Sequence, residues 1–378
     1  MSSAADVPVP QIDPREAARR QAAGALLLDV REPGEWALGA PDGAIRISLG
    51  ALASAADRLP PRTQEILAIC ATGRRSLLAA QQLREAGWPH VASVAGGFVR
   101  WCEQGLPWSA QSSLDADARA RYARHLVLPE VGEAGQHRLL AAHVLLVGAG
   151  GLGSPAAFYL AAAGVGRITV VDPDVVDRSN LQRQILHTDA RVGMSKVESA
   201  RDALQALNPG IVIDALPLRV DSGNAAALVG AADVVVDGTD NFTARYLLDA
   251  ACTLHGKPLV YGAIHRFDGQ IAVFGGAPGA PCYRCLFPDP PAAEDAPDCA
   301  TAGVLGVLPG IIGSLQAAEA IKLILGIGEP LRGRLLNLQA LGMHWRELRV
   351  PRDPHCPGCG PEAGRRPPQG LEALCALA

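Results

Sequence analysis

Two kinds of cysteine motif flank a glycine-rich loop in this chain. Cys70 opens the sequence Cys70-Ala-Thr-Gly-Arg-Arg-Ser76 directly after an apolar run, at the expected start of a helix. Loop amides, the positive end of the helix dipole and neighbouring arginines all favour the thiolate, the nucleophilic form of cysteine, or a persulfide. This motif therefore predicts sulfur chemistry at Cys70.

Four further cysteines form two CxxC pairs, Cys282/Cys285 and Cys356/Cys359. Four thiolates suit tetrahedral Zn²⁺, and such a set leaves no open coordination position for water. We therefore expect a structural zinc site and not a catalytic one. The alternative is that these cysteines are redox-active or merely buried.

The glycine-rich loop follows one apolar run and opens another. Its glycines allow a tight turn and let a phosphate approach the backbone at the N-terminus of a helix. Asp172 ends the next apolar run, where an acid can bind ribose hydroxyls. The pattern predicts a nucleotide site without distinguishing NAD from ATP, and the alternative is a glycine turn without a ligand. The four glycines concerned are Gly148, Gly150, Gly151 and Gly153.

Charged residues beyond this loop favour ATP over NAD. Arg183 and Lys196 follow the second apolar run, and Asp240 follows a later one. An open α/β sheet binds ligands at the carboxyl ends of its strands, so we expect these residues to meet there. Cleavage of a triphosphate needs cations to offset developing charge, and a carboxylate can hold Mg²⁺. The alternative for each residue considered alone is that the two cations are solvated at the surface and that Asp240 is the N-cap of a helix.

Short apolar, β-branched runs alternate with helical sequence along most of the chain. The expected strands are 26–30, 44–48, 65–70, 91–95, 143–147, 167–172, 211–217, 233–238 and 258–264. The expected helices are 76–88, 116–126, 132–142, one from residue 154 and one near 195–206. This alternation predicts α/β domains with mainly parallel sheets, followed by antiparallel strands at 269–276 and 334–339.

Length and composition limit the classes of protein. The 378 residues suffice for two or three domains, and a net charge of −4 gives no case for a nucleic-acid or anionic-membrane partner. The first 20 residues lack the apolar stretch typical of a signal peptide, so we expect the nine cysteines to be in the reducing cytoplasm. The apolar run 303–326 contains polar residues, so we expect a buried helix and no membrane span.

The same sequence patterns suggest where the domains end. We expect a first domain over 10–108, a linker over 109–116, a second domain over 117–360 and a disordered tail over 361–378. The linker is small and polar, and the tail is rich in proline and glycine.

The second domain resembles the E1-like adenylating enzymes of the MoeB/ThiF/HesA group. The matching text is RYARH, GAGGLG, DPDVVDRSNLQRQ, GMSKVESA, DGTDN, CYRCLF and CPGC, in that order. The resemblance implies a Rossmann-like adenylation domain that binds ATP and Mg²⁺ and holds Zn²⁺ on the four cysteines. It also implies a homodimer in which Arg124 reaches the partner's ATP. The implied nucleotide contacts are Asp172, Ser179, Asn180, Leu181, Gln182, Arg183, Lys196, Asp240 and Asn241.

The first domain resembles a rhodanese. Supporting text is the Cys-x-x-Gly-x-Arg-Ser loop at Cys70, DVREPGEW at 29–36 and VAGGF at 94–98. The resemblance implies an N-terminal α/β sulfurtransferase domain with Cys70 as its catalytic residue. The alternative is an inactive rhodanese fold that serves as an adaptor.

An isolated cysteine, Cys299, follows a stretch rich in proline, alanine and aspartate that is too polar for a core. A loop cysteine can carry a nucleophile to an adenylate. In similar enzymes this position takes part in covalent transfer to, or capture of, the C-terminus of a small sulfur carrier protein. The alternative is a small buried hydrophobe.

The two resemblances together imply an adenylyltransferase (a nucleotidyltransferase) fused to a sulfurtransferase. ATP would activate the terminal Gly-Gly carboxylate of a small ubiquitin-like, MoaD-like sulfur carrier as acyl-AMP. A persulfide on Cys70, loaded from thiosulfate or a cysteine desulfurase, would then supply the sulfur of a thiocarboxylate. The expected pathway is molybdenum cofactor (molybdopterin) synthesis, and the alternative is a ThiS-like carrier for thiamine or another thiolation pathway.

Two readings from other classes remain. One is an NAD-dependent oxidoreductase with a regulatory rhodanese module. This function does not explain Arg183, Lys196 or the CxxC pairs. The other is a non-catalytic scaffold for a ubiquitin-like partner. A scaffold would not need Cys70 or Asp240.

Overall fold

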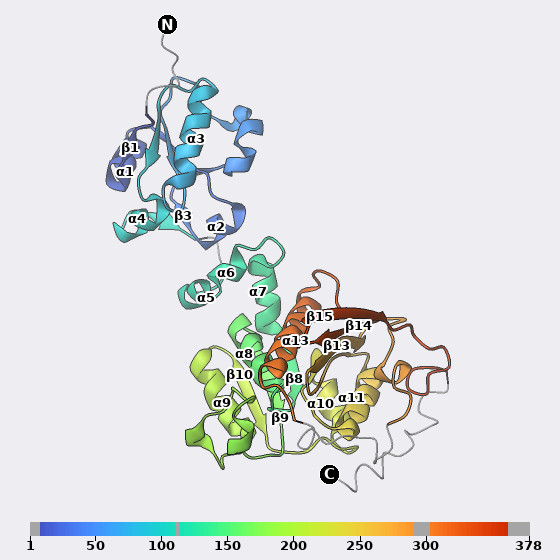
Figure 1. Ribbon diagram of the computed structural model, residues 1–378. Coiled ribbons are helices and arrows are strands. Elements are labelled where there is room, and N and C mark those ends of the chain that lie inside the picture. Colours follow the sequence, from blue (N-terminus) through green and yellow to red (C-terminus); the bar gives the residue numbers. More distant parts are fainter. Residues whose placement is uncertain (1–7, 111–112, 291–302, 362–378) are drawn as a thin grey trace. The chain divides into compact units, whose positions relative to one another are not determined.

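The structure, a computed structural model, describes residues 8–110, 113–290 and 303–361. The chain divides into two compact units, with the division between Gln136 and His137 (Figure 1). Cys299 and nearly all of the expected tail lie outside the described residues. The expected linker and domain bounds stay predictions.

The N-terminal unit is built on a five-stranded, all-parallel sheet. The central strand is apolar and buried along its whole length, as expected of a parallel sheet covered on both faces. All four predicted strands are present, although the predicted strand at 44–48 is shorter. In spatial order the strands are β1 (Gln11–Ile12), β6 (Val91–Val94), β5 (Ile66–Ile69), β2 (Leu26–Asp29) and β4 (Ile45–Arg46), and β3 (Ala40–Pro41) pairs separately with β7 (Trp108–Ser109).

Helices connect these strands. The predicted helix at 76–88 is α3 (Arg74–Glu85), which begins four residues after Cys70. The expected helical segments at 116–126 and 132–142 are divided into three helices. The other helices of this region are α1 (Pro14–Ala22), α2 (Pro33–Leu38), α4 (Gly97–Glu103), α5 (Ala116–Arg121), α6 (Ala123–Leu126) and α7 (Gly132–Ala141), with 3-10 helices η2 (Leu49–Ser54) and η3 (Ala56–Arg58).

The C-terminal unit contains an eight-stranded mixed sheet. Five neighbouring strands are parallel and the last three run antiparallel, which confirms the predicted α/β architecture and its antiparallel extension. The final strand was not predicted. In spatial order the strands are β10 (Val212–Leu216), β9 (Arg167–Val171), β8 (His143–Val147), β11 (Val234–Asp237), β12 (Pro258–His265), β13 (Asp268–Gly275), β14 (Arg334–Gln339) and β15 (His344–Arg349).

The strand order reverses direction at β8. The chain passes from β8 to β9 and β10 on one side, then returns to β11 on the other side of β8. Such a switch point opens a crevice beyond the carboxyl ends of the two diverging strands, where α/β proteins bind ligands. The glycine loop follows β8 directly, and Gly238 follows β11.

The apolar run near the C-terminus forms α13. This helix has the length and apolar composition of a membrane span, but it packs against α8 and strands β11, β12 and β13. Gln316 and Glu319 are buried within these contacts, as expected for a core helix. The helices of this unit are α8 (Gly153–Ala163), α9 (Lys196–Leu207), α10 (Ala225–Gly230), α11 (Phe242–His255) and α13 (Val307–Leu325), with 3-10 helices η4 (Arg178–Asn180), η5 (Asp189–Arg191) and η6 (Tyr283–Cys285).

Candidate functional site

The glycine loop is packed too tightly for side chains. Gly148 has φ of +96°, and a Cβ placed there would lie 2.5 Å from the carbonyl oxygen of Gly238. A Cβ on Gly153 would lie 1.8 Å from the carbonyl oxygen of Gly148. Glycine at these positions lets the loop turn sharply and lets α8 start close to the strand.

Backbone amides of this loop are available to a ligand. The N–H of Ala149 donates to Asp172 Oδ2 at 2.8 Å, and that carboxylate also accepts the N–H of Asp174 at 2.9 Å. The N–H groups of residues 150–152 have no acceptor within the described part of the chain. Unpaired amides before a helix form an anion-binding site, which suits a phosphate.

A cavity of about 1190 Å³ opens at this loop. It brings together most of the residues predicted for the nucleotide site. The predicted residues that line it are Gly148, Gly150, Gly151, Asp172, Arg183, Lys196, Asp240 and Asn241. Within the described ranges, the predicted residues that do not line it are Gly153, Ser179, Asn180, Leu181 and Gln182.

Residues 179–182 do not line the cavity, but two of them contact Arg183, which does. Arg183 Nη2 donates to Asn180 Oδ1 at 2.6 Å, and Nη1 lies 3.5 Å from the carbonyl oxygen of Ser179. Ser179 itself is tied to Asp177 through its N–H and hydroxyl. This short turn therefore orients the guanidinium that faces the cavity.

The second predicted cation, Lys196, pairs with an acid. Lys196 is buried at the start of α9, and its Nζ donates to Asp174 Oδ2 at 2.8 Å. An ammonium has three N–H donors, so this contact leaves donors for an anion in the cavity. Arg183 and Lys196 therefore place two positive charges at the lining of the cavity.

Asp240 is exposed in the cavity and has no hydrogen-bond or ion-pair partner among the described residues. The N-cap of α11 is Asn241, whose Oδ1 accepts the N–H of Ala244 at 2.8 Å. The alternative that Asp240 caps this helix is therefore wrong. A free carboxylate beside phosphates fits Mg²⁺, which is commonly bound by one or two carboxylates plus phosphate oxygens.

A buried arginine that the sequence did not indicate shapes the turn before Asp240. Arg245 Nε donates to Asp237 Oδ2 at 2.7 Å, and its Nη2 donates to the Thr239 carbonyl at 3.1 Å. Asp237 Oδ1 in turn accepts the N–H and hydroxyl of Thr239. An arginine inside an amphipathic helix ordinarily faces solvent, so nothing in the sequence signalled this role.

Gln184 is a second residue that the nucleotide prediction left out. It lines the cavity, is only 5% exposed, and its Oε1 has no hydrogen-bond partner among the described atoms. Buried polar atoms are rarely left unpaired. Gln184 therefore fits a ligand contact, and its place beside Arg183 was the available signal.

Beyond the loop, the cavity continues to an aromatic wall. Tyr261, Tyr283 and Phe287 line this part, and Arg245 lies 4.8 Å from the Tyr261 ring centroid. The volume exceeds that of a typical small-ligand pocket, which is about 300–1000 Å³. The cavity therefore has room for a second substrate group beside a nucleotide.

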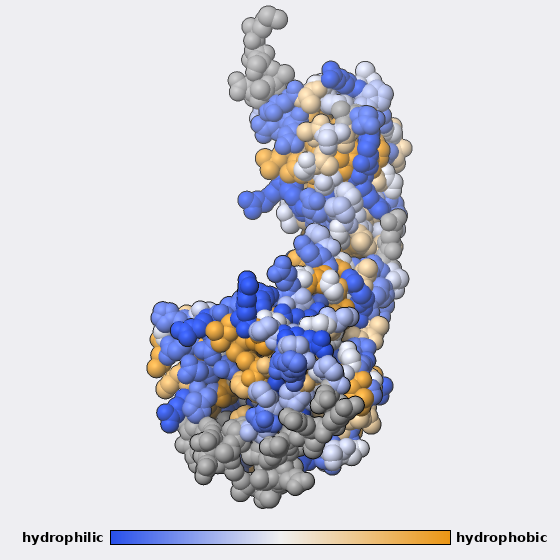
Figure 2. Space-filling model, turned by 90° about the vertical axis from the view of Figure 1, so that its right-hand side faces the viewer, coloured by the Kyte–Doolittle hydropathy of each residue, from blue (hydrophilic) through white to orange (hydrophobic). Residues whose placement is uncertain are grey.

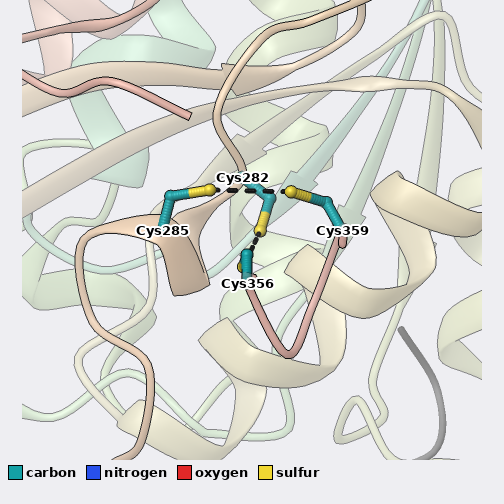
Figure 3. A group of neighbouring side chains, drawn as sticks. All are labelled: Cys282, Cys285, Cys356 and Cys359. Carbon is teal, nitrogen blue, oxygen red and sulfur yellow. Dashed lines mark hydrogen bonds between the residues drawn. The ribbon is translucent and has the colours of Figure 1, made fainter. Parts of the chain in front are cut away.

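The two CxxC pairs meet in space, as Figure 3 shows. All four sulfurs lie within 4.8 Å of one another, with Cys282–Cys356 and Cys285–Cys359 Sγ–Sγ distances of 3.5 Å. Tetrahedral Zn²⁺ with bonds of about 2.3 Å places its sulfurs about 3.8 Å apart. The donor set and spacing therefore fit zinc.

Burial makes two of these thiols, Cys282 and Cys285, poor anions by themselves. It raises the pKa of Cys282 well above its ordinary value and that of Cys285 to about 12. Both would stay protonated at neutral pH unless a cation compensated the thiolate charge. Asp249 of α11 supports the turn by accepting the Tyr283 N–H at 2.7 Å.

We expect Cys356→Ser to lower zinc content and thermal stability together, because three thiolates and a hydroxyl hold zinc more weakly than four thiolates. Wild type should contain about one Zn²⁺ per chain. Elemental analysis and thermal unfolding measure the two effects, with Cys102→Ser, outside the cluster, as the control. A fully metallated Cys356→Ser variant, or metal-stripped wild type of equal stability, would contradict the site.

In the N-terminal unit, Cys70 directly follows β5 and lies in the loop before α3. Its Sγ accepts the N–H of Gly73 at 3.1 Å and lies 3.5 Å from Ser76 Oγ. Burial opposes ionisation, but hydrogen bonds from Ser76 and from the loop amides outweigh it and lower the pKa of Cys70. The loop therefore favours the thiolate, as its sequence predicts.

The two loop arginines differ in their surroundings. Arg75 makes a two-fold ion pair with Glu35 of α2, with both N–O distances 2.7 Å. Arg74 is exposed and has no partner within the described ranges. Arg75 thus anchors the loop through Glu35, and Arg74 is the loop cation left for an anionic sulfur donor.

The lowered pKa gives a pH test. The thiolate fraction rises as pH rises through the pKa, so alkylation of Cys70 should reach half its maximum below the ordinary thiol pKa of about 8.5. Cys102, whose pKa burial raises, provides an internal control and should react at higher pH. Peptide mass spectrometry after iodoacetamide treatment measures both. A Cys70 midpoint at or above the ordinary value would contradict the loop's effect.

Two predicted residues are not placed at either site. Arg124 is exposed on α6, and its reach to a partner's nucleotide stays a prediction. Cys299 lies outside the described residues, so its role also stays a prediction.

Comparisons with known families agree with both predicted resemblances. A model of the ThiF family matches residues 122–358, and a model of the rhodanese-like domain matches residues 13–104. The ThiF match alone covers more than half of the chain.

Curated relatives cover mainly the second part of the chain. SAMP-activating enzyme E1 of Haloferax volcanii is 52% identical over 66% of this chain and 91% of its own length. Sulfur carrier protein adenylyltransferase of Thermus thermophilus is 53% identical over 68% of this chain and 96% of its own length. Adenylyltransferase and sulfurtransferase MOCS3 of Mus musculus is 47% identical over 71% of this chain and 58% of its own length.

Solved structures share the fold at lower identity. E. coli MccB with MccA-N7isoASN has a TM-score of 0.56 at 24% identity, covering 64% of this chain and 75% of MccB. PaaA has a TM-score of 0.56 at 20% identity, covering 68% of this chain and 81% of PaaA. These likenesses concern the fold alone.

Proposed function

Because the chain belongs to the ThiF family and carries a rhodanese-like domain, we propose that it converts the terminal carboxylate of a small ubiquitin-like sulfur carrier into a thiocarboxylate. The relatives are named adenylyltransferases and sulfurtransferases, and this chain is an enzyme of that type that uses ATP. The substrate end is a C-terminal Gly-Gly carboxylate, and the carrier is MoaD-like.

One observation carries the adenylation step. The cavity at the switch point collects free loop amides, two cations and a partner-free carboxylate within one volume. The amides, Arg183 and Lys196 suit the phosphates of ATP, and Asp240 suits Mg²⁺. Asp172 and Gln184 are the contacts proposed for the ribose and for a polar group of the nucleotide or the carboxylate.

Activation is needed because a free carboxylate is a poor electrophile. A carboxylate oxygen of the carrier attacks the α-phosphorus, the bond to pyrophosphate breaks, and acyl-AMP forms. The cations at the cavity stabilise the charge that moves onto the leaving pyrophosphate. AMP then serves as the leaving group for the next step.

The sulfur step uses Cys70. Its terminal persulfide sulfur attacks the acyl carbon and displaces AMP, which leaves an acyl disulfide. A thiol then attacks the Cys70 sulfur, so the carrier departs as a thiocarboxylate and the two protein sulfurs end as a disulfide. Cys299 is our candidate for that thiol. A thiol reductant must then reduce the disulfide to two thiols, and thiosulfate or a cysteine desulfurase is the proposed donor that afterwards reloads Cys70.

The carrier must also dock on the protein surface. Exposed apolar side chains on and before β15 are suited to a protein partner: Leu341 is 70% exposed, Met343 63% and Trp345 46%. Apolar residues among hydrophilic ones are visible on the face drawn in Figure 2. Homodimer formation, a cytoplasmic location and the molybdenum cofactor pathway also belong to this proposal.

Carrier-dependent ATP–pyrophosphate exchange by the purified protein tests the adenylation step. MoaD-like and ThiS-like carriers, each with and without the terminal Gly-Gly, separate the two pathways. Exchange with neither carrier, or NADH formation in place of exchange, would overturn the proposal.

A further inference from the structure

A buried histidine lies between the glycine loop and α9. His187 is 5% exposed, its Nε2 lies 2.9 Å from the carbonyl oxygen of Ala149, and its Nδ1 lies 2.9 Å from Ser199 Oγ. It does not line the cavity. Neither the sequence motifs nor the proposed chemistry assigns it a role.

The two contacts determine where the histidine proton is. A carbonyl oxygen only accepts hydrogen bonds, so Nε2 carries the proton and donates to Ala149. Nδ1 of the neutral ring then accepts the hydroxyl proton of Ser199. Burial lowers the pKa of His187, so the neutral ring with a proton on Nε2 is the form favoured at physiological pH.

Ala149 is held on both of its backbone groups. Its N–H donates to Asp172 Oδ2 at 2.8 Å, and its carbonyl accepts from His187. In a trans peptide, the N–H of the next residue points opposite to the carbonyl. The His187 contact therefore directs the N–H of Gly150, a cavity residue, away from the histidine.

The same network reaches the lysine of the cavity. Asp172 accepts the N–H of Asp174, Asp174 pairs with Lys196, and Lys196 begins the helix that carries Ser199. The loop amides and the cationic side chain are thus fixed to one helix, at Ser199 through His187 and at Lys196 through Asp174.

We propose that His187 is a positioning residue that holds the Ala149–Gly150 peptide with its N–H toward the phosphates of the bound nucleotide. The identity of that nucleotide as ATP rests on the proposed function. The geometry requires a donor to the Ala149 carbonyl at this place, and it does not require a titrating ring. Glutamine, which offers an N–H donor and an oxygen acceptor, should therefore replace histidine, whereas leucine should not.

The test compares His187→Leu with His187→Gln in the full chain. ATP binding by calorimetry should weaken about tenfold in His187→Leu, the effect of losing one buried hydrogen bond that orients the loop. In pyrophosphate exchange, the KM for ATP should rise by a similar factor while kcat and the KM for the carrier stay within about threefold. His187→Gln should restore both values.

Leu204→Ala is the matched control, since it removes a fully buried apolar side chain from α9 and no hydrogen bond to the loop. A general loss of stability lowers the active fraction and hence kcat, but it leaves the KM for ATP unchanged. Unchanged ATP affinity in folded His187→Leu, or His187→Gln as impaired as His187→Leu, would overturn the proposal. Intact ATP binding without carrier-dependent exchange would instead overturn the proposed function.

Discussion

Replacing Lys196, Arg183 or Asp240 by alanine is expected to lower carrier-dependent ATP–pyrophosphate exchange by about 10²–10³-fold, while the fold stays intact. This is the usual cost of removing one preorganised electrostatic contact from a transition state. Asp240→Asn tests the same position with a smaller change in shape. It is the sharpest test, because Asp240 has no partner among the described residues and loss of its carboxylate breaks no internal contact. Radiolabelled pyrophosphate incorporation into ATP measures the effect.

Matched controls lie in the same stretch of chain. Arg178 and Asp189 form an exposed ion pair with each other and do not line the cavity. Arg178→Ala and Asp189→Asn should therefore leave exchange unchanged, because exposed ion pairs contribute little to stability. Near wild-type exchange in all three cavity variants would remove the basis for adenylation at this site.

The nucleotide-binding residues could be predicted from the sequence because local geometry determines where they lie. A glycine loop between a β-branched run and a small-residue run can be placed without knowledge of the fold, and β8 spans the predicted residues 143–147. Acids and cations that end successive strands then meet because parallel strands share one carboxyl edge. Arg183, Lys196 and Asp240 were found by this reasoning and line one cavity.

The residues that support this site could not be found in the same way. His187 contacts a backbone carbonyl 38 residues away in the sequence, and Arg245 donates to carbonyls 6 and 17 residues away. No local pattern encodes which carbonyl a buried donor will meet. Ser179 and Asn180 belong to the recognised motif, yet they orient Arg183 and do not line the cavity. Membership of a motif alone therefore does not show whether a residue lines the cavity or orients a residue that does.

The missed secondary structure has a different cause. Every residue of β15 is exposed, and its sequence HWRELR has no apolar alternation, as is common for an edge strand protected by charge. The short helices α2 and α4 are below the length at which apolar periodicity can be recognised. The fold class was nevertheless predictable, because it depends on the buried central strands.

Cys70→Ala is expected to retain pyrophosphate exchange and to lose sulfur transfer from thiosulfate or a persulfide donor. Acyl-adenylate formation needs ATP, Mg²⁺ and a carboxylate but no thiol, and Cys70 belongs to a separate loop with its own thiolate-stabilising contacts. Mass spectrometry of the carrier measures the outcome as replacement of one terminal oxygen by sulfur. Cys102→Ala, in the same unit but outside the loop, should leave both reactions unchanged.

The two reactions can also be separated by blocking adenylation and keeping Cys70 intact. Asp240→Asn should block exchange while thiosulfate still loads sulfur onto Cys70, since the rhodanese loop does not depend on the nucleotide cavity. Cys299→Ala should keep exchange and Cys70 loading, and should slow release of the thiocarboxylate if Cys299 supplies the resolving thiol. If Cys70→Ala makes thiocarboxylate at the wild-type rate with the rhodanese donor as sole sulfur source, the sulfur does not pass through Cys70, and the proposed coupling of the two activities is wrong.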